Sequence, residues 1–521
     1  MSARSLLAAL GFPLGFGLLA VLLGKDDNWD LLHYHYYNPH AWLHGRNGHD
    51  LLAADFHVYF NPLLDLPFYL GNRHLPGAAL TFLLGALHGV NGLLLWRIAG
   101  HVLRPGTGVP PLVPALVGML GAGSIYVVGT TYYDALVALP VFAALWLILR
   151  RWDLVQHGPL GRSLPLLVLA GACAGTGVGL KQTVAVFAVG IGVALLLLPG
   201  RRIASMVAFG IGGVIGVLAT SGFWLWHLWE TTGNPLFPYF NHVFRSPLGP
   251  AEDLRTRHAM PRDLWEALTW PLVMLRAPWR VDSPVRDAKL LVAYLAVPAG
   301  LLLALARPRA ENLLAERRIA VFLLVATAVS YLVWLRLFSI YRYLIPVEML
   351  APLVILAALG FAPLAPRAAR ILAVALMIAI LPIQPSNRDR IAWDGAMGAP
   401  FVAAAPPGGM ALEGALVVVP GWHPGWRPNA FVIPFFPPEV PFLRIVAHDD
   451  PAGRLVTGFD AEIARRIATH PGPVLVLMTP GGEAHVTASL ARHNLAAEFA
   501  ACRRLTTSIG GPLALCPVGR R

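Results

Sequence analysis

The sequence has few charged residues for its length. Of its 521 residues, 13% are charged and 56% are hydrophobic, and the mean hydropathy is +0.61. A water-soluble domain carries about 25% charged residues. The composition therefore excludes a water-soluble protein and predicts an integral membrane protein with α-helical spans.

Acidic residues are outnumbered by basic ones, and the formal net charge is +12. Such a charge can indicate a nucleic-acid partner, but the basic residues cluster in short segments between apolar runs. Cytoplasmic loops of membrane proteins carry this excess of Lys and Arg. The charge therefore indicates membrane topology, and we expect no nucleic-acid partner. The clusters are Arg97/Arg104, Arg150/Arg151, Arg201/Arg202, Arg307/Arg309/Arg317/Arg318 and Arg367/Arg370.

Several motifs of soluble enzymes are absent. The chain has no Walker loop, no dinucleotide-binding fingerprint after a strand, no paired-cysteine motif and no His-Glu-x-x-His. Of the three cysteines, Cys173 lies in an apolar run and is predicted to be a packing residue. Cys502 and Cys516 flank a turn between two strand-like segments. We predict that they form a disulfide in an oxidising compartment; two unpaired thiols are the alternative.

Apolar runs dominate the first three quarters of the chain. With Arg4 before the first run, they predict about eleven membrane spans and a cytoplasmic N-terminus. All the basic clusters then fall on one side. The runs are 6–23, 76–96, 111–129, 131–149, 163–180, 183–199, 203–228, 288–306, 319–337, 344–363 and 368–384.

The character of the chain changes near Pro385. Apolar runs shorten to strand length and alternate with helical patterns at 459–470 and 483–493. This alternation predicts a small α/β domain over residues 386–521, with a partly parallel sheet, after a transmembrane domain over residues 1–385. An odd number of spans places this second domain outside.

An acidic stretch follows the first apolar run. Asp26, Asp27 and Asp30 lie at the start of a long outer loop, residues 25–75, which is rich in His and aromatic residues. Carboxylates at a membrane boundary are costly unless they have a partner or face a wet cavity. We therefore interpret the stretch as an active-site loop; an ordinary hydrated loop is the alternative. If the segment is helical, Asp27 and Asp30 share a face, and their repulsion raises the pKa of one.

The other outer turns supply candidate substrate-binding residues. Lys181, Arg336 and Arg342 break the positive-inside pattern. A lone cation in a tight outer turn favours an anionic partner, so we expect at least two of them to converge within one cavity above the first loop; snorkelling side chains are the alternative. Further candidates are Arg46, Tyr34, Glu230 and Asn234, with Asp134 as a second acid.

Histidines are frequent in the same outer loop. Together with the nearby aspartates they could coordinate a divalent metal ion, although interfacial histidines are more often amphipathic surface residues. No cofactor is certain from the sequence, and the identity of any metal stays unknown. The histidines are His33, His35, His40, His44, His49 and His57.

Several short motifs lie within residues 1–385: Asp30 with Tyr34 four residues later, Ala41 to Gly45, Asn61-Pro62-Leu63, Tyr133-Asp134 and Arg342-Tyr343-Leu344-Ile345-Pro346. These motifs resemble those of the GT-C glycosyltransferases, and the nearest architectural relatives are the protein O-mannosyltransferases and the aminoarabinose transferases of lipid A. Relatives often carry Asp-Glu, whereas here the acids are Asp26, Asp27 and Asp30.

The resemblance implies a GT-C-type glycosyltransferase of the bacterial inner membrane, part of the cell envelope, with a periplasmic C-terminal domain. It would transfer a hexose or pentose, with inversion, from a polyprenyl-phosphate donor to a glycan, lipid or protein acceptor. The expected roles are Asp30 as base, with Asp27 as the second choice, and Asp134 as an acid that orients the acceptor. A transporter or flippase of lipid-linked intermediates is the alternative.

Overall fold

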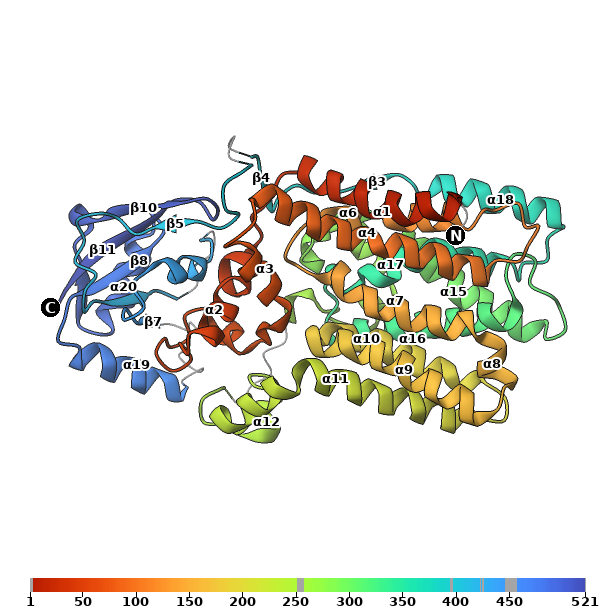
Figure 1. The fold of residues 1–521 in the computed structure, drawn as a ribbon, viewed down its shortest axis with the longest axis horizontal. Helices are drawn as coiled ribbons and strands as arrows, with labels where there is room; N and C mark the ends of the chain where they lie inside the picture. Colours follow the sequence, from red (N-terminus) through yellow and green to blue (C-terminus); the bar gives the residue numbers. More distant parts are fainter. Residues whose placement is uncertain are drawn as a thin grey trace. The chain divides into compact units, whose positions relative to one another are not determined.

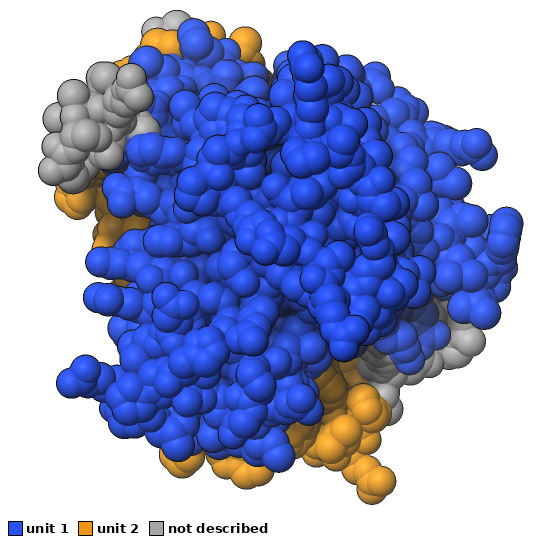
Figure 2. All heavy atoms as spheres, turned by 90° about the vertical axis from the view of Figure 1, so that its right-hand side faces the viewer, with its two compact units in different colours: residues 1–23, 81–222, 255–388 blue, residues 24–80, 223–254, 389–521 orange. Residues whose placement is uncertain are grey.

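The computed structural model describes residues 3–250, 257–393, 397–421, 423, 426–445 and 457–520, without the side chains of residues 3–8. The chain is mostly helical, with a sheet near its C-terminus (Figure 1). It divides into two compact units (Figure 2). Unit 1 contains residues 1–23, 81–222 and 255–388, and unit 2 contains residues 24–80, 223–254 and 389–521.

Unit 1 is built from the apolar runs. Its short strands β2 (Arg286–Asp287) and β3 (Ile383–Gln384) pair with each other. Two of its helices, α4 and α11, extend beyond the unit's boundaries. The helices are α1 (Ala3–Leu22), α4 (Gly77–Val102), α5 (Leu112–Met119), α6 (Ala122–Tyr126), α7 (Asp134–Arg150), α8 (Trp152–His157), α9 (Leu160–Leu180), α10 (Ala185–Ala194), α11 (Arg202–Thr232), α13 (Leu264–Leu268), α14 (Trp270–Arg276), α15 (Lys289–Ala306), α16 (Arg317–Leu337), α17 (Ile345–Leu359) and α18 (Pro366–Ala379).

Six helices in the described part of the chain are long and apolar enough to cross a membrane, so the expected eleven spans are not confirmed. Four of the expected runs contain shorter helices: 111–129 is divided between α5 and α6, and the helices of 131–149, 183–199 and 368–384 are α7, α10 and α18. The six are Gly77–Val102, Leu160–Leu180, Arg202–Thr232, Lys289–Ala306, Arg317–Leu337 and Tyr341–Leu359.

Small residues bring helices of unit 1 close together. A Cβ added to Gly171 or Gly175 of α9 would overlap backbone carbonyls of Phe209 or Gly213 on α11. Helices in membranes associate through such close contacts, because there is no hydrophobic driving force between them in lipid. Close packing of α9 and α11 therefore depends on glycine at these positions.

Unit 2 combines the first long loop with the C-terminal residues. Its helical elements include a π-helical turn, η1 (Leu31–His35), and its strands belong to two sheets. The remaining elements are β1 (Lys25–Asp26), α2 (Tyr37–Leu43), η2 (Asp55–Tyr59), η3 (Pro62–Leu64), α3 (Leu66–Gly71), α12 (Asn241–Phe244), β4 (Arg390–Ile391), β5 (Ala404–Ala405), β6 (Leu416–Val419), η9 (Ala430–Phe435), β7 (Phe442–Arg444), α19 (Gly458–Thr469), β8 (Val474–Met478), α20 (Glu483–Ala491), β9 (Leu495–Ala497), β10 (Arg503–Thr507) and β11 (Leu513–Arg520).

The larger sheet has the order β5-β10-β11-β8-β6-β7, with β9 paired to β11. Strand β6 lies between β7 and β8 and is parallel to both, whereas β11 is antiparallel to β8. The predicted partly parallel α/β domain is therefore confirmed. Its buried core also contains Leu51, Leu52 and Phe56 from the first long loop. This loop is therefore partly built into the domain.

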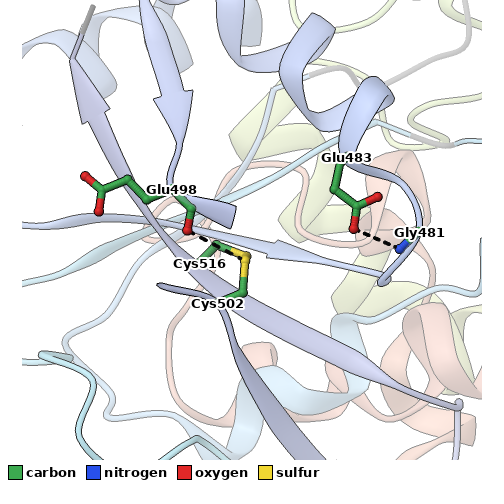
Figure 3. The surroundings of a disulfide bond; sticks show 5 residues. All are labelled: Gly481, Glu483, Glu498, Cys502 and Cys516. Carbon is green, nitrogen blue, oxygen red and sulfur yellow. Dashed lines mark hydrogen bonds between the residues drawn. A yellow bond between two sulfur atoms is a disulfide. The ribbon is translucent and has the colours of Figure 1, made fainter. Parts of the chain in front are cut away.

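The C-terminal hairpin carries the predicted disulfide. Strands β10 and β11 are antiparallel, with Arg503 opposite Leu515, which places Cys502 opposite Cys516. The two sulfurs are bonded (Figure 3). Cys173, the third cysteine, is free. The pairing confirms that the turn between the two strands brings the cysteines together.

Candidate functional site

Three charged side chains of unit 1 meet at the ends of three helical elements. Asp134 is the first residue of α7, Lys181 follows the last residue of α9, and Arg342 lies in η8 (Tyr341–Leu344), just before α17. Lys181 Nζ donates to Asp134 Oδ1 at 2.5 Å, and Arg342 Nη1 donates to Asp134 Oδ2 at 3.1 Å. We call these three residues the Asp134 cluster.

Aromatic residues flank the Asp134 cluster. The Arg342 guanidinium lies 3.9 Å from the ring centroid of Tyr132, and Lys181 Nζ lies 5.2 Å from that of Tyr343. Lys181 Nζ also donates to the carbonyl of Tyr132 at 2.8 Å. The side chain of Lys181 is 14% exposed, whereas that of Asp134 is 2% exposed. Two cations and one carboxylate carry a net charge of +1, which suits an anionic group such as a phosphate.

The structure thus brings together two of the three cations that the sequence predicted in outer turns. Asp134, expected to orient an acceptor, is the direct partner of both Lys181 and Arg342. The third cation, Arg336, is exposed in the last turn of α16 and forms no ion pair with any described residue. The sequence suggested an anionic partner for these cations but did not identify Asp134 as that partner.

Unit 1 contains a second buried charged group, which was not predicted from the sequence. Glu348 of α17 accepts hydrogen bonds from the backbone N–H groups of Gly123 and Ser124 at 3.0 and 2.9 Å, and from Tyr341 Oη at 2.5 Å. A Cβ on Gly121 would overlap the Glu348 carboxylate. An acid inside an apolar run is the signal that could have revealed it.

Asp287 extends this group. Its Oδ2 accepts from the backbone N–H of Ala122 at 2.8 Å and from Lys289 Nζ at 3.0 Å, and its Oδ1 accepts from the backbone N–H of Lys289. The side chains of Asp287 and Lys289 are fully buried. Together with Glu348 they satisfy the first N–H groups of α6, where the run 111–129 breaks. Irregular backbone at membrane depth is tolerated where protein satisfies it in this way.

In unit 2, the three aspartates of the acidic stretch have different surroundings. Asp26 lies in β1, opposite Arg390 of β4, and accepts hydrogen bonds from the backbone and side chain of Asn28. These contacts shape the loop. Asp27 is tied to the C-terminal residues: its Oδ1 accepts from the backbone N–H of Gly510 at 2.7 Å, and its Oδ2 lies 3.0 Å from Arg427 Nη2.

Burial raises the pKa of Asp27 above its ordinary value of 3.8, and this effect outweighs the opposing effects of Arg427 and of the Gly510 hydrogen bond. A carboxylate with a raised pKa can take up a proton more readily than an exposed one. Asp27 therefore has one property of a general base.

The segment from Asp27 to Asp30 is not one helix, so the condition under which the two aspartates would share a helical face is not met. Asp30 immediately precedes η1, whereas Asp27 lies in non-helical backbone before it. The contacts of Asp27 with Arg427 and Gly510, and the pairing of β1, hold this segment in an extended form. These long-range contacts determine the conformation of the segment, so the three-residue separation of Asp27 and Asp30 does not place them on one helical face.

Asp30 is 8% exposed and lies at the start of a buried turn. Tyr34, one turn later, packs against the ring of His35 at 4.2 Å and that of His57 at 5.2 Å. His35 Nδ1 lies 2.6 Å from Asp65 Oδ1. Single π-helical turns such as η1 are rare and occur frequently at functional sites. This geometry keeps Asp30 and Tyr34 as candidates.

The histidines of the first loop are mostly aromatic packing partners. Burial, with a smaller effect of His57, lowers the pKa of His33 well below its ordinary value, so the ring is neutral. Burial also lowers the pKa of His40, to about 3. Within the described ranges, no group of three or more His, Cys, Asp or Glu side chains is placed to hold a metal ion.

Three further candidates from the sequence belong neither to the Asp134 cluster nor to the group around Glu348. Arg46 is buried and makes two hydrogen bonds to Asp50 and two to backbone carbonyls, so its donors hold the fold of unit 2. Asn234 is buried and stabilises its own turn through Leu236 and Tyr239. Glu230 is exposed near the end of α11. Of these three residues, only the role of Arg46 could have been identified from the sequence, because Arg46 and Asp50 have i,i+4 spacing.

No family model matches the chain, and neither a curated protein nor a solved structure matches it. The Asp134 cluster in unit 1 and the Asp27–Asp30 segment in unit 2 are the two candidate sites.

Proposed function

We propose that this protein is an integral membrane glycosyltransferase. It moves a sugar from a polyprenyl-phosphate donor to an acceptor on the outer face of the membrane, with inversion. The observation that carries the proposal is the Asp134 cluster, in which Lys181 and Arg342 come from separate helical elements and meet at one carboxylate.

The cluster suits the leaving group of this reaction. As the bond between the sugar and the phosphate breaks, the phosphate oxygen takes the electron pair, and fixed cations stabilise the charge that develops. Asp134 holds Lys181 and Arg342 side by side before the donor arrives. The Arg342 guanidinium, stacked on Tyr132, can bind phosphate oxygens in a bidentate manner.

A carboxylate must take the proton from the acceptor hydroxyl as this oxygen attacks the anomeric carbon. We assign this role to Asp30, with Asp27 as the second choice. Asp30 is supported by its place at a buried π-helical turn with Tyr34. Asp27 is supported by its raised pKa, but its carboxylate is occupied by Arg427 and Gly510.

A transporter or flippase of lipid-linked intermediates is the rival proposal. The buried group of Glu348, Asp287 and Lys289 favours it, because charges inside membrane proteins often mark transport pathways. However, every carboxylate oxygen of Glu348 and Asp287 accepts a hydrogen bond from an N–H or O–H donor. This arrangement fixes both carboxylates as anchors of α6, so we favour the transferase.

The test uses the full chain in proteoliposomes with undecaprenyl phosphate carrying radiolabelled glucose, mannose, galactose or arabinose, and cell-envelope extract as acceptor. We expect Lys181→Met and Arg342→Met each to raise the KM for the donor about tenfold or more, as for a lost charge-assisted hydrogen bond. Arg336→Met is the matched control and should leave the KM unchanged.

Two results would contradict the proposal. The first is an equal effect of Arg336→Met, which would separate donor binding from the Asp134 cluster. The second is movement of a fluorescent undecaprenyl-phosphate sugar between leaflets, measured by dithionite quenching, with no sugar transfer from any donor. That result would favour the flippase.

A further inference from the structure

The carboxyl ends of two parallel strands in unit 2 carry an unassigned group of side chains. Strands β6 and β8 are adjacent and parallel. His423 and Trp426 follow β6, while Thr479 follows β8 and His485 lies in the first turn of α20. In open α/β sheets, ligands bind at the carboxyl ends of the strands. The position is therefore one where the fold favours a binding site.

Three rings lie in mutual contact there. The ring centroids of His423 and Trp426 are 5.4 Å apart, those of His423 and His485 are 4.9 Å apart, and those of Trp426 and His485 are 5.1 Å apart. A Cβ on Gly482 would overlap the Trp426 indole. The indole therefore lies directly against the backbone at the start of α20, and glycine is required at position 482.

Two polar atoms in this group lack partners among the described residues. His423 Nδ1 and Thr479 Oγ1 are buried and make no hydrogen bond with the described part of the chain. Buried polar atoms are nearly always hydrogen-bonded, so both atoms are available to a ligand or to ordered water. The opposite side of the group is fixed, because His485 Nε2 lies 3.2 Å from the carbonyl oxygen of Gly421.

The chemistry of the group selects among ligands. Imidazole and hydroxyl groups both donate and accept hydrogen bonds, and an indole offers a flat apolar face. A metal ion is disfavoured, because no third His, Cys, Asp or Glu joins the two histidines within the described ranges. Arg427, the adjacent cation, is paired with Asp27, which disfavours an anion. A sugar ring, with hydroxyls at its edge and an apolar C–H face, fits both features.

We propose that His423, Trp426, Thr479 and His485 form a saccharide-binding site in unit 2. The indole of Trp426 packs on the apolar face of the sugar, while His423 Nδ1 and Thr479 Oγ1 bind its hydroxyls. Arg427, the next residue after Trp426, contacts both the carboxylate and the backbone carbonyl of Asp27. The site is thus joined through one residue to the acidic stretch.

The binding of a saccharide follows from these contacts alone. Its identification as the acceptor of the transfer reaction rests on the proposed function. The two can fail separately, because binding is measured without turnover. A protein that binds saccharide but transfers no sugar would retain the site and lose the transferase.

The experiment is saturation-transfer difference NMR on the full chain in nanodiscs. The probes are the methyl glycosides of glucose, galactose, mannose and N-acetylglucosamine. The variants are His423→Ala, His485→Ala and Trp426→Phe, the last of which keeps an aromatic ring in the core. His470→Ala is the matched control, because His470 Nε2 also lies 3.0 Å from a backbone carbonyl oxygen, that of Gly414, before the amino end of β6.

We expect at least one probe to bind the unmodified chain. His423→Ala should weaken its binding about fivefold to tenfold, as for one lost hydrogen bond. His485→Ala, which removes a ring that packs against Trp426, and Trp426→Phe should each weaken it about threefold. His470→Ala should bind within twofold of the unmodified chain. Thermal melts identify any variant that fails to fold. If a histidine variant fails to fold, the binding measured for Trp426→Phe decides whether the group binds saccharide.

Three outcomes would overturn the proposal. One is that no probe binds the unmodified chain. Another is that His423→Ala, His485→Ala and Trp426→Phe bind as the unmodified chain does, or that His470→Ala loses binding to the same extent. The third is tight binding of Zn²⁺ that needs both His423 and His485 and is not displaced by saccharide, which would make the group a metal site.

Discussion

Two buried aspartates, one in each unit, are paired with cations in different ways. Asp134 in unit 1 faces two cations, Lys181 and Arg342, whose side chains are 14% and 7% exposed. Asp27 in unit 2 faces one cation, Arg427, whose side chain is 39% exposed, and a backbone N–H group. The first arrangement has a surplus of positive charge and the second has none.

The difference indicates that the two aspartates suit different chemical roles. Surplus positive charge in a protected place favours the binding of an anion, whereas a carboxylate with a raised pKa and a solvent-screened partner is suited to proton exchange. Under the proposed function, the Asp134 cluster of unit 1 is the candidate donor site, and the acidic stretch of unit 2 contains the candidate base.

The sharpest test of these roles is Asp30→Asn. Removal of a general base lowers turnover about a hundred- to ten-thousandfold. We expect this loss with a donor KM within twofold of the original, because the Asp134 cluster is unchanged. Sugar transfer under saturating donor measures it. If Asp27→Asn loses turnover and Asp30→Asn does not, the base is Asp27; if neither variant loses it, the enzyme proposal is wrong.

Asp134→Asn should affect folding as well as donor binding. It leaves Lys181 and Arg342 side by side without their carboxylate, and breaking a buried pair in this way costs roughly 3–5 kcal/mol. Thermal and denaturant unfolding in detergent measures the loss. The double variant Asp134→Asn/Lys181→Met should recover part of the stability, because it removes one of the two cations that have lost the Asp134 carboxylate. An unchanged melting temperature for Asp134→Asn would contradict the buried ion pair.

Replacing Cys502 and Cys516 by Ser should affect unit 2 only. The disulfide joins residues separated by 14 positions. Loop closure of this length contributes roughly 3 kcal/mol in the chain-entropy model. We expect lower stability of the C-terminal hairpin, measured by hydrogen exchange, with an unchanged donor KM. In the denatured, unreduced chain, thiol titration should find Cys173 alone; three reactive thiols would contradict the pairing.

The smallest effect concerns the pH dependence of Asp27. Because burial raises its pKa above 3.8 in the folded chain, the folded state binds a proton more readily than the unfolded state. Its contribution to stability therefore rises as the pH falls from its raised pKa toward 3.8, and is lost as the pH rises through the raised pKa. The melting temperature of Asp27→Asn, subtracted from that of the original chain across pH 4–7, should show this slope. A flat difference would contradict the raised pKa.

Local patterns in the sequence predicted much of the fold. The lengths of apolar runs predicted a helical membrane protein, and the alternation of short apolar and amphipathic segments predicted the sheet with parallel β6 and β8. The turn between Cys502 and Cys516 predicted their disulfide. Each of these features depends on residues near one another in the chain, where propensity and spacing carry the information.

Features that depend on distant residues were missed. The sequence did not show that Arg427 binds Asp27, from which it is separated by 400 positions. The non-helical backbone at Asp27 could therefore not be predicted, and a helical face shared by Asp27 and Asp30 was left open. The sequence also did not show that Glu348 satisfies the backbone of Gly123, and the broken run 111–129 was therefore expected to form one span. The convergence of Lys181 and Arg342 was expected because a charge in an apolar turn has few alternatives.

The anchoring of α6 has a consequence for biogenesis. The N–H groups of Gly123 and Ser124 are synthesised 225 and 224 residues before the Glu348 carboxylate that accepts them, and Ala122 precedes Asp287 by 165 residues. At a translation rate of about 5–20 residues per second, the interval before Glu348 emerges is roughly 11 to 45 s. Until Asp287 is synthesised α6 has neither carboxylate partner, and until Glu348 is synthesised the N–H groups of Gly123 and Ser124 lack theirs. The final contacts of α6 therefore form only after α17 has been synthesised, late in the synthesis of unit 1.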